Sequence, residues 1–276
     1  MAKAFDTYSV MVPRLSDILE LLEKIAPSDL AEVWDNPGLQ VGRYSQEIRK
    51  ILFSLDPTIE AIRTAQKGSA QLLLTHHPLI FKPLSRLDTD SFPGNVVSEA
   101  IKNGISIVSA HTNLDMAKGG INDVLAGLLD LQNVEVLVRS EKDNEAGLGR
   151  IGDLLHPVTL AAMTESIKRI LGTGDLKPIG PKDRVVRRVA VVGGSGGDLV
   201  HMACERGADI LLTGDIGHHQ ALEARALGIA LIDGGHFGTE KAAFRVIADH
   251  MRGVVTAEGW KVEIEVDEDE EDPMLI

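Results

Sequence analysis

The apolar residues of this chain follow two alternating patterns, which predict strands and helices in turn. Residues 51–55, 72–75 and 105–108 are short, nearly continuous apolar runs, as expected for strands buried on both faces of a sheet. Between the first two runs, residues 57–66 have helical character, and Gly68 is a suitable stop for that helix. Strands that alternate with helices in this way predict an α/β fold with a parallel sheet.

The same succession of strand and helix occurs again in the second half of the chain, which predicts an internal repeat. The paired features are the strand starts at Lys50 and Arg188, the helix stops at Gly68 and Gly207, the strands 72–75 and 210–213, the helix stops at Gly104 and Gly228, and the strands 105–108 and 229–232. We therefore expect two pseudo-repeated α/β units.

These patterns give the expected domain organisation. Residues 1–139 form a first α/β unit, which includes an amphipathic N-terminal helix over residues 13–26. Residues 187–265 form the second unit, and residues 140–186 connect the two. Residues 266–276 are mostly acidic, and we expect them to be a solvated, disordered tail.

The connecting segment has some structure of its own. Residues 160–171 have apolar side chains on one helical face and are followed by Gly172, which predicts a helix that ends there. A strand is expected near residues 150–154. The rest of the segment is rich in glycine, proline and polar residues, which favour loops.

Two adjacent histidines, His76 and His77, follow one of the buried strands, and Pro78 ends it. Ligands of open α/β sheets bind at the carboxyl ends of the strands. Adjacent residues of an extended chain point in opposite directions, so the two imidazoles suit two neighbouring metal ions better than one. The alternative is a structural role, in which one histidine packs in the core and the other caps a loop.

Each half of the chain also has a histidine with a carboxylate four residues later, just after its last strand. These residues are His111 and Asp115 in the first half, and His236 and Glu240 in the second. In the first turn of a helix, residues i and i+4 share a face, so each imidazole would point with its carboxylate. Together with the adjacent histidines, this set could hold two divalent ions, and it suits zinc, manganese, iron, cobalt or nickel.

Two further segments leave alternatives open. Asp215, His218 and His219 follow a strand of the second half, and they either support the metal site or form the exposed start of a helix. Residues 193–197 are rich in glycine and follow another strand. They either form a tight strand-to-helix turn or hold phosphate with backbone N–H groups.

The composition and net charge indicate which partners and which cellular location to expect. The chain has 276 residues, one cysteine and a formal net charge of −13. An acidic surface repels phosphate backbones, so we expect no stable nucleic-acid binding. The sequence has neither the apolar segment of a signal peptide nor the roughly 18 apolar residues of a membrane span. We therefore expect a cytoplasmic protein that does not contact a membrane, and the single cysteine agrees with a reducing compartment.

Several motifs resemble those of the Nif-three-like dinuclear metal proteins, whose members are often labelled GTP cyclohydrolase type 2 homologues. They occur in the family's order, at residues 35–39, 75–81, 110–115, 213–216 and 233–240. The resemblance extends from about residue 16 to about residue 249 and does not include the acidic tail. It implies two linked α/β halves in a compact form, without an extra middle domain.

The resemblance also implies a metal site and an assembly. It implies a dinuclear site between the two α/β units, in which the metals are held by His76, His77, Asp115, His236 and Glu240. It places His111 beside the site. The assembly that it implies is a ring-like homohexamer.

Two functions are consistent with these features. The first is a metal-dependent hydrolase of a nucleotide, in its sharpest form a GTP cyclohydrolase type 2-like enzyme that opens the imidazole ring of guanine. A metal ion lowers the pKa of bound water, and His111 would carry protons because imidazole titrates near neutral pH. The alternative is a metal-binding regulatory or scaffold protein that catalyses no reaction.

Overall fold

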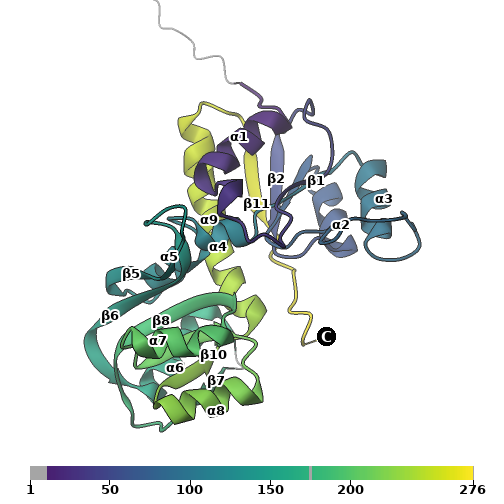
Figure 1. Ribbon diagram of the computed structural model, residues 1–276. Coiled ribbons are helices and arrows are strands. Elements are labelled where there is room, and N and C mark those ends of the chain that lie inside the picture. Colours follow the sequence, from purple (N-terminus) through teal and green to yellow (C-terminus); the bar gives the residue numbers. More distant parts are fainter. Residues whose placement is uncertain (1–10, 174–175, 276) are drawn as a thin grey trace, which may run out of the picture. The chain divides into compact units, whose positions relative to one another are not determined.

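The computed structural model describes residues 11–173 and 176–275 (Figure 1). Residues 1–10, in which no signal peptide was expected, lie outside the described residues. The described chain forms two compact units that interleave along the sequence. The first unit comprises residues 11–23, 36–110 and 248–270, and the second comprises residues 24–35, 111–173, 176–247 and 271–275.

A five-stranded sheet forms the centre of the first unit, with the strand order β1-β4-β3-β2-β11 among the described residues. Strands β2, β3, β4 and β11 are parallel, and β1 is antiparallel to β4. The elements of this unit are α1 (Leu15–Ile25, except its last two residues), β1 (Gly38–Val41), β2 (Lys50–Ser54), α2 (Ile59–Lys67), β3 (Leu72–Thr75), α3 (Gly94–Lys102), β4 (Ser106–Ser109), the C-terminal part of α9 (His236–Ala257) and β11 (Glu263–Val266).

Both faces of this sheet are covered, as the continuous apolar runs predicted. Leu52, Leu73 and Ile107 share a buried cluster with side chains of α2 and α3. Figure 1 shows these two helices together on one side of the sheet. Ile51 and Leu72 alternate with the members of that cluster and are also fully buried, so the opposite face is covered too. The sheet is therefore a rigid support for the residues at the carboxyl ends of its strands.

The second unit is built on a six-stranded sheet, in which the described strands have the order β5-β6-β8-β9-β10-β7. Strands β8, β9 and β10 are parallel, whereas β5, β6 and β7 are each antiparallel to their neighbours. Its elements are η1 (Ser28–Leu30), α4 (Thr112–Met116), α5 (Ile121–Leu128), β5 (Gln132–Arg139), β6 (Gly147–Thr159), α6 (Leu160–Leu171), β7 (Lys177–Ile179), β8 (Val185–Ser195), η2 (Gly197–Leu199), α7 (Val200–Glu205), β9 (Ile210–Gly214), α8 (His218–Leu227), β10 (Ala230–Asp233) and the N-terminal part of α9.

The internal repeat predicted from the sequence is present in the topology of the two sheets. In each unit, three parallel strands lie side by side in the order in which they occur along the chain, with a helix after each of the first two. The registers also correspond, because the residues aligned across the three strands are Ile51, Leu72 and Ser106 in the first sheet and Val189, Ile210 and Ala230 in the second. The chain is therefore an α/β protein made of two pseudo-repeated units.

Residues 140–186 add to the second sheet. Strand β6 contains the strand predicted near residues 150–154, and α6 coincides with the predicted helix. The hydroxyl of Thr159 caps the start of α6 by accepting a hydrogen bond from the Ala162 N–H at 3.2 Å. Gly172 ends the helix at a φ of 67°, a backbone conformation that glycine adopts without steric cost.

A buried ion pair joins α5 to β6 in the second unit. Arg150 is 1% exposed, and its guanidinium donates to both carboxylate oxygens of Asp123, at 2.6 and 2.7 Å. It also donates to the carbonyl oxygens of Gly147 and Gly149, at 2.8 and 2.9 Å. These contacts neutralise the buried charge and satisfy its donors, which is the condition for a buried ion pair to be tolerated.

We expect Asp123→Ala to lower the free energy of unfolding by about 3 kcal/mol, because it leaves the buried Arg150 guanidinium without its counter-charge. The pair of Lys118 and Glu145, 2.9 Å apart and exposed in the same unit, offers a matched control. Glu145→Ala should change the unfolding transition little, because solvent screens both charges. Urea unfolding of the wild type and both variants measures the difference, and equal stability of the two variants would contradict the prediction.

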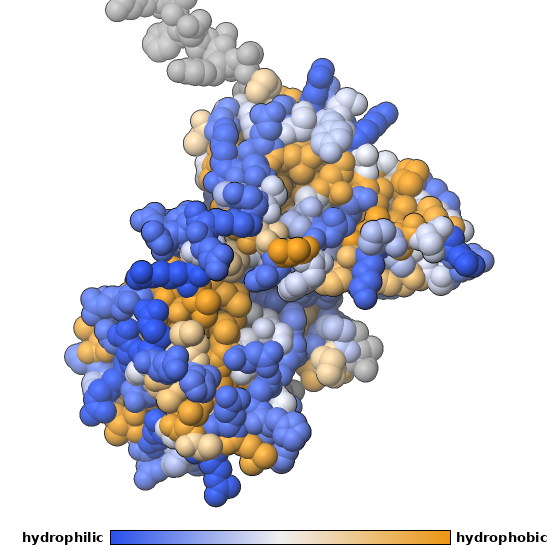
Figure 2. Space-filling model, in the orientation of Figure 1, coloured by the Kyte–Doolittle hydropathy of each residue, from blue (hydrophilic) through white to orange (hydrophobic). Residues whose placement is uncertain are grey.

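Figure 2 shows that hydrophilic residues cover much of the visible surface, with apolar residues gathered in patches, one of them near α3 of the first unit. Four large apolar side chains between β3 and α3, those of Phe81, Leu84, Leu87 and Phe92, are 41–66% exposed. Exposed apolar groups of this kind are typical of surfaces that contact other proteins. In the part of the chain that the structure describes, no helix has the length and apolar character needed to cross a bilayer.

Candidate metal centre

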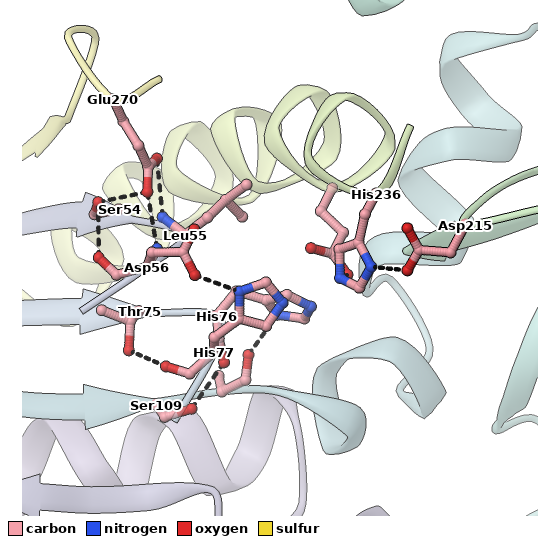
Figure 3. A network of polar contacts seen from close by, with 12 residues as sticks. Ser54, Leu55, Asp56, Thr75, His76, His77, Ser109, Asp215, His236 and Glu270 are labelled. Atoms are coloured by element: carbon pink, nitrogen blue, oxygen red, sulfur yellow. Dashed lines mark hydrogen bonds and ion pairs between the residues drawn. The ribbon is translucent and has the colours of Figure 1, made fainter. Parts of the chain in front are cut away.

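His76 and His77 follow β3, at the edge of the first sheet where its parallel strands have their carboxyl ends. His76 is fully buried, and its Nδ1 lies 2.8 Å from the carbonyl oxygen of Ala110. The Nδ1 of His77 lies 2.8 Å from Oδ1 of Asp56 (Figure 3). An oxygen acceptor at Nδ1 favours the tautomer that carries its proton there, so in both rings Nε2 is the nitrogen suited to bind a metal.

Asp56 was not among the residues that the sequence pointed to. It lies two residues after β2, next to Pro57, so β2 and β3 deliver Asp56 and His77 to the same edge of the sheet. Parallel neighbouring strands end at the same edge, and that topology was the signal from which this contact could have been predicted.

His111 is the residue that precedes α4 in the second unit. Its Nδ1 lies 2.8 Å from Oδ1 of Asp35, whose side chain is fully buried. The other oxygen of Asp35 accepts a hydrogen bond from the Thr112 N–H at 3.1 Å. Asp35 therefore orients the His111 ring. The His111 and Trp34 rings form a T-shaped pair, with their centroids 6.1 Å apart.

Asp115 lies on α4, four residues after His111, and is 8% exposed. The hydrogen bond from the Asp115 N–H to the His111 carbonyl oxygen, at 3.1 Å, forms the helical turn that the sequence predicted. The carbonyl oxygen of Asp115 accepts a hydrogen bond from the side chain of Asn122 at 2.9 Å. This contact holds the backbone of α4 near its end.

His236 and Glu240 begin α9 in the second unit. The Nε2 of His236 lies 3.1 Å from Oε1 of Glu240, which confirms that the two side chains share a helix face. Glu240 is 3% exposed. Both residues belong to a group of side chains whose donor atoms lie close enough together to hold a metal ion. The part of the chain that the structure describes therefore includes a histidine and glutamate cluster with the composition of a metal site.

Asp215 orients the His236 ring from the opposite side. Its Oδ2 lies 2.7 Å from Nδ1 of His236, and its backbone has a φ of 58°, which is uncommon for a residue other than glycine (Figure 3). Of the two interpretations that the sequence left open for Asp215, the structure supports contact with the candidate site. His218 and His219 are exposed at the start of α8, as in the other interpretation.

The glycines near the end of β8 allow the backbone to approach the Glu240 side chain closely. A Cβ atom on Gly194, whose φ is 62°, would lie 2.2 Å from Oε1 of Glu240 and 3.2 Å from Nε2 of His236. The N–H groups of Gly193 and Gly194 donate to the side chains of Asn122 and Thr239, at 2.9 and 3.0 Å. These two N–H groups therefore serve the protein's own packing, which argues against the phosphate-binding alternative at this position.

The His236 imidazole has a pKa raised from 6.5 to about 9. The hydrogen bond to Glu240 is the largest cause; the charge of Glu240 and the contact with Asp215 add to it, and burial opposes it. In the metal-free protein, His236 is therefore protonated at neutral pH. Because a metal ligand must be deprotonated, metal binding at neutral pH would release this proton.

We expect the stability of the metal-free protein to fall as the pH rises from 6.5 to beyond 9. A folded-state pKa above the unfolded value stabilises the protein fully below pH 6.5, and that contribution is lost as the pH rises through about 9. Thermal unfolding in excess chelator at several pH values would measure this. The His236→Gln variant is the control, and its unfolding temperature should change less over the same interval. Identical pH profiles for the two proteins would contradict the prediction.

Comparison with known proteins supports the resemblance seen in the motifs. A family model described as Duf34/NIF3 (NGG1p interacting factor 3) matches residues 13–273, so the match includes most of the acidic C-terminal segment that the resemblance had left out. A Clostridium perfringens protein named GTP cyclohydrolase 1 type 2 homolog is 37% identical over 94% of this chain and 98% of its own length. A Helicobacter pylori protein named GTP cyclohydrolase 1 type 2 is 32% identical over 91% of this chain and 98% of its own.

A solved structure gives the same result for the fold. The crystal structure of a Bacillus cereus protein related to NIF3 superposes with a TM-score of 0.90 at 28% identity, and it covers 95% of this chain and 99% of that one. Similarity of this extent includes both sheets and the segments that carry the candidate ligands.

Proposed function

We propose that this chain, which belongs to the Duf34/NIF3 family, binds two divalent metal ions and uses them to hydrolyse a nucleotide. The proposed metal ligands are His76, His77, Asp115, His236 and Glu240. Imidazole nitrogens and carboxylate oxygens suit zinc, manganese, iron, cobalt and nickel. The proposed reaction is hydrolytic opening of the guanine imidazole ring of GTP, as the names of the curated relatives suggest.

The proposal rests on one arrangement of the imidazole ring that four histidines have in common. In each of them, Nδ1 lies 2.7–2.8 Å from an oxygen acceptor, and the acceptors are Ala110, Asp56, Asp35 and Asp215 for His76, His77, His111 and His236, respectively. Histidines that bind metals nearly always have a carboxylate or carbonyl at the other ring nitrogen, which fixes the tautomer and the ring orientation. These four histidines lie at strand ends or at the starts of the helices that follow them. That all four have this arrangement favours a metal site over unrelated structural roles for each histidine.

Divalent ions of this kind activate water for hydrolysis near neutral pH. The residues of the chain would orient the metal ligands, offset the charge of the ions and transfer protons. Asp56 and Asp215 hold the His77 and His236 rings in one orientation, and the carboxylates of Asp115 and Glu240 offset the positive charge of the ions. His111 would take a proton at Nε2 and return it to the leaving nitrogen of the substrate, while the buried Asp35 carboxylate holds the ring in one orientation through Nδ1.

Product analysis tests the proposal. The protein, loaded separately with zinc, manganese, iron, cobalt or nickel, would be incubated with GTP, the other nucleoside triphosphates and a chromogenic phosphoester. Ring opening adds one water at C8 of guanine and breaks one C8–N bond, and a second water breaks the other and releases C8 as formate, so mass spectrometry of the nucleotide identifies the reaction. Chelator-treated protein is the control. If no loaded form converts any of these compounds, the non-catalytic metal-binding alternative becomes the better description.

We also propose that the protein is a cytoplasmic homo-oligomer, with the hexamer implied by the family resemblance as its specific form. The exposed apolar side chains between β3 and α3, from Phe81 to Phe92, support a contact with another protein surface. Light scattering that reports a monomer at micromolar concentration would contradict the proposed assembly.

A further inference from the structure

The acidic C-terminal segment runs beside β2 as far as its carboxyl end. Strand β11 pairs with β2 in parallel, with Glu263 aligned with Lys50 and Val266 with Phe53. Beyond the strand, the Asp267 N–H donates to the carbonyl oxygen of Phe53 at 2.7 Å. The segment that the composition assigned to a solvated tail therefore lies next to the strand end that carries Asp56.

There the Glu270 carboxylate accepts three hydrogen bonds from consecutive residues (Figure 3). Its Oε1 accepts from the Ser54 hydroxyl at 2.9 Å and from the Asp56 N–H at 2.8 Å, and its Oε2 accepts from the Leu55 N–H at 3.0 Å. Hydrogen bonds to an ionised carboxylate are about twice as strong as those between neutral groups. Both carboxylate oxygens of Glu270 are thus used to fix the backbone at the end of β2.

Asp56 connects this contact to the candidate metal centre. Its N–H binds Glu270, and its carboxylate binds Nδ1 of His77 at 2.8 Å. The two interactions restrain the same residue from its backbone and its side chain. A change in the Asp56 backbone would move the carboxylate that determines which His77 nitrogen carries the proton.

We infer that Glu270 is a positioning residue for His77, acting through Asp56. The inference rests on the proposed role of His77 as a metal ligand, whereas the link from Glu270 to the His77 ring can be tested without metal. Residues that orient a metal-binding histidine typically change metal affinity by 10–100-fold when they are replaced. The C-terminal segment therefore helps to position a proposed ligand of the metal centre.

The test compares Glu270→Ala and Glu270→Gln with the wild type. Alanine removes all three acceptor contacts. Glutamine keeps the size of the side chain but has one acceptor oxygen in place of two, so at least one of the three donors loses its acceptor. Glu271→Gln is the matched control, because Glu271 is the adjacent residue of the same type and is exposed.

The first measurement is the tautomer of His77 in the metal-free protein, read from the ¹⁵N shifts of its ring at a pH where the ring is neutral. We expect a single Nδ1–H tautomer in the wild type and in Glu271→Gln, and a mixture in Glu270→Ala. The His76 ring is an internal reference that should not change, because its Nδ1 is held by the Ala110 carbonyl oxygen. A mixture in Glu270→Gln would support the same conclusion if the alanine variant fails to fold.

The second measurement is the affinity for zinc and for manganese, obtained by competition with a chelating dye. Glu270→Ala should bind about 10–100-fold more weakly than the wild type, with Glu271→Gln unchanged. If both Glu270 variants retain the wild-type His77 tautomer and metal affinity, Glu270 stabilises only the fold and the inference is wrong. A wild type that binds neither metal would refute the proposed function instead, while the tautomer measurement would still decide whether Glu270 positions His77.

Discussion

Replacing Glu240 by Gln is expected to preserve the fold, weaken metal retention and abolish metal-dependent hydrolysis. Glu240 is 3% exposed and lies 3.1 Å from Nε2 of His236, so its charge is held in a fixed, largely dry position next to another proposed ligand. The amide keeps the shape of the side chain, but it removes the negative charge that would offset the dications. It also removes one of two oxygens able to bridge them. The loss of affinity should exceed the roughly 10–100-fold that is typical for a residue that only orients a ligand.

The same variant has a readout that does not require metal. The hydrogen bond to Glu240 is the largest cause of the raised pKa of His236, so Glu240→Gln should lower that pKa. Metal content after dialysis, the NMR titration of His236 and the hydrolysis assay would be measured on one preparation. Glu223→Gln, an exposed glutamate of α8, is the control and should match the wild type in all three. Full metal content in Glu240→Gln would show that Glu240 is not a ligand.

The sequence was sufficient to predict the architecture because the fold depends on long apolar runs and their order. Residues 51–55, 72–75 and 105–108 are nearly continuous apolar runs, which only a sheet covered on both faces can bury. The repeat was detectable because glycines end corresponding helices in both halves. Antiparallel strands at the sheet edges were harder to predict, since β5 and β7 have few buried residues and no clear alternation of buried and exposed side chains.

Local geometry explains which parts of the candidate site were predicted. His236 and Glu240 are four residues apart in a regular helix, so their contact follows from helical spacing alone. His111 and Asp115 have the same spacing, but His111 precedes α4 and its ring nitrogen Nδ1 binds Asp35, 76 residues earlier. A contact of that sequence separation depends on how the chain folds, and spacing does not predict it.

The contacts of the C-terminal segment could not be predicted from the sequence, for the same reason. Glu270 binds the backbone of Asp56 across a separation of 214 residues. A run of acidic residues has the composition of a solvated tail, because charged side chains alone bury little apolar surface. What fixes this run is the pairing of β11 with β2, in which Ile264 is buried and Val266 partly buried. Composition averaged over a segment conceals the few positions that determine its structure.

Replacing His111 by Ala is expected to slow hydrolysis by about 10²–10⁴-fold while metal content stays at the wild-type level, because general acid–base catalysis typically contributes that much. The structure gives the reason for a proton-transfer role. The Nδ1 of His111 is held by Asp35, so Nε2 is the nitrogen that would exchange a proton with the substrate. The Asp35 side chain, fully shielded from solvent, holds the ring in one orientation while the proton is exchanged.

Asp35→Asn provides the matched variant for this prediction. The amide keeps the size of the Asp35 side chain and can still accept a hydrogen bond from Nδ1, but a bond to an uncharged acceptor is weaker and holds the ring less firmly. We therefore expect a loss of rate in Asp35→Asn that is smaller than the loss in His111→Ala. Metal content, measured by atomic emission on both variants, separates proton transfer from ligation. If His111→Ala loses its metal, His111 is itself a ligand, and proton transfer must be assigned to another group.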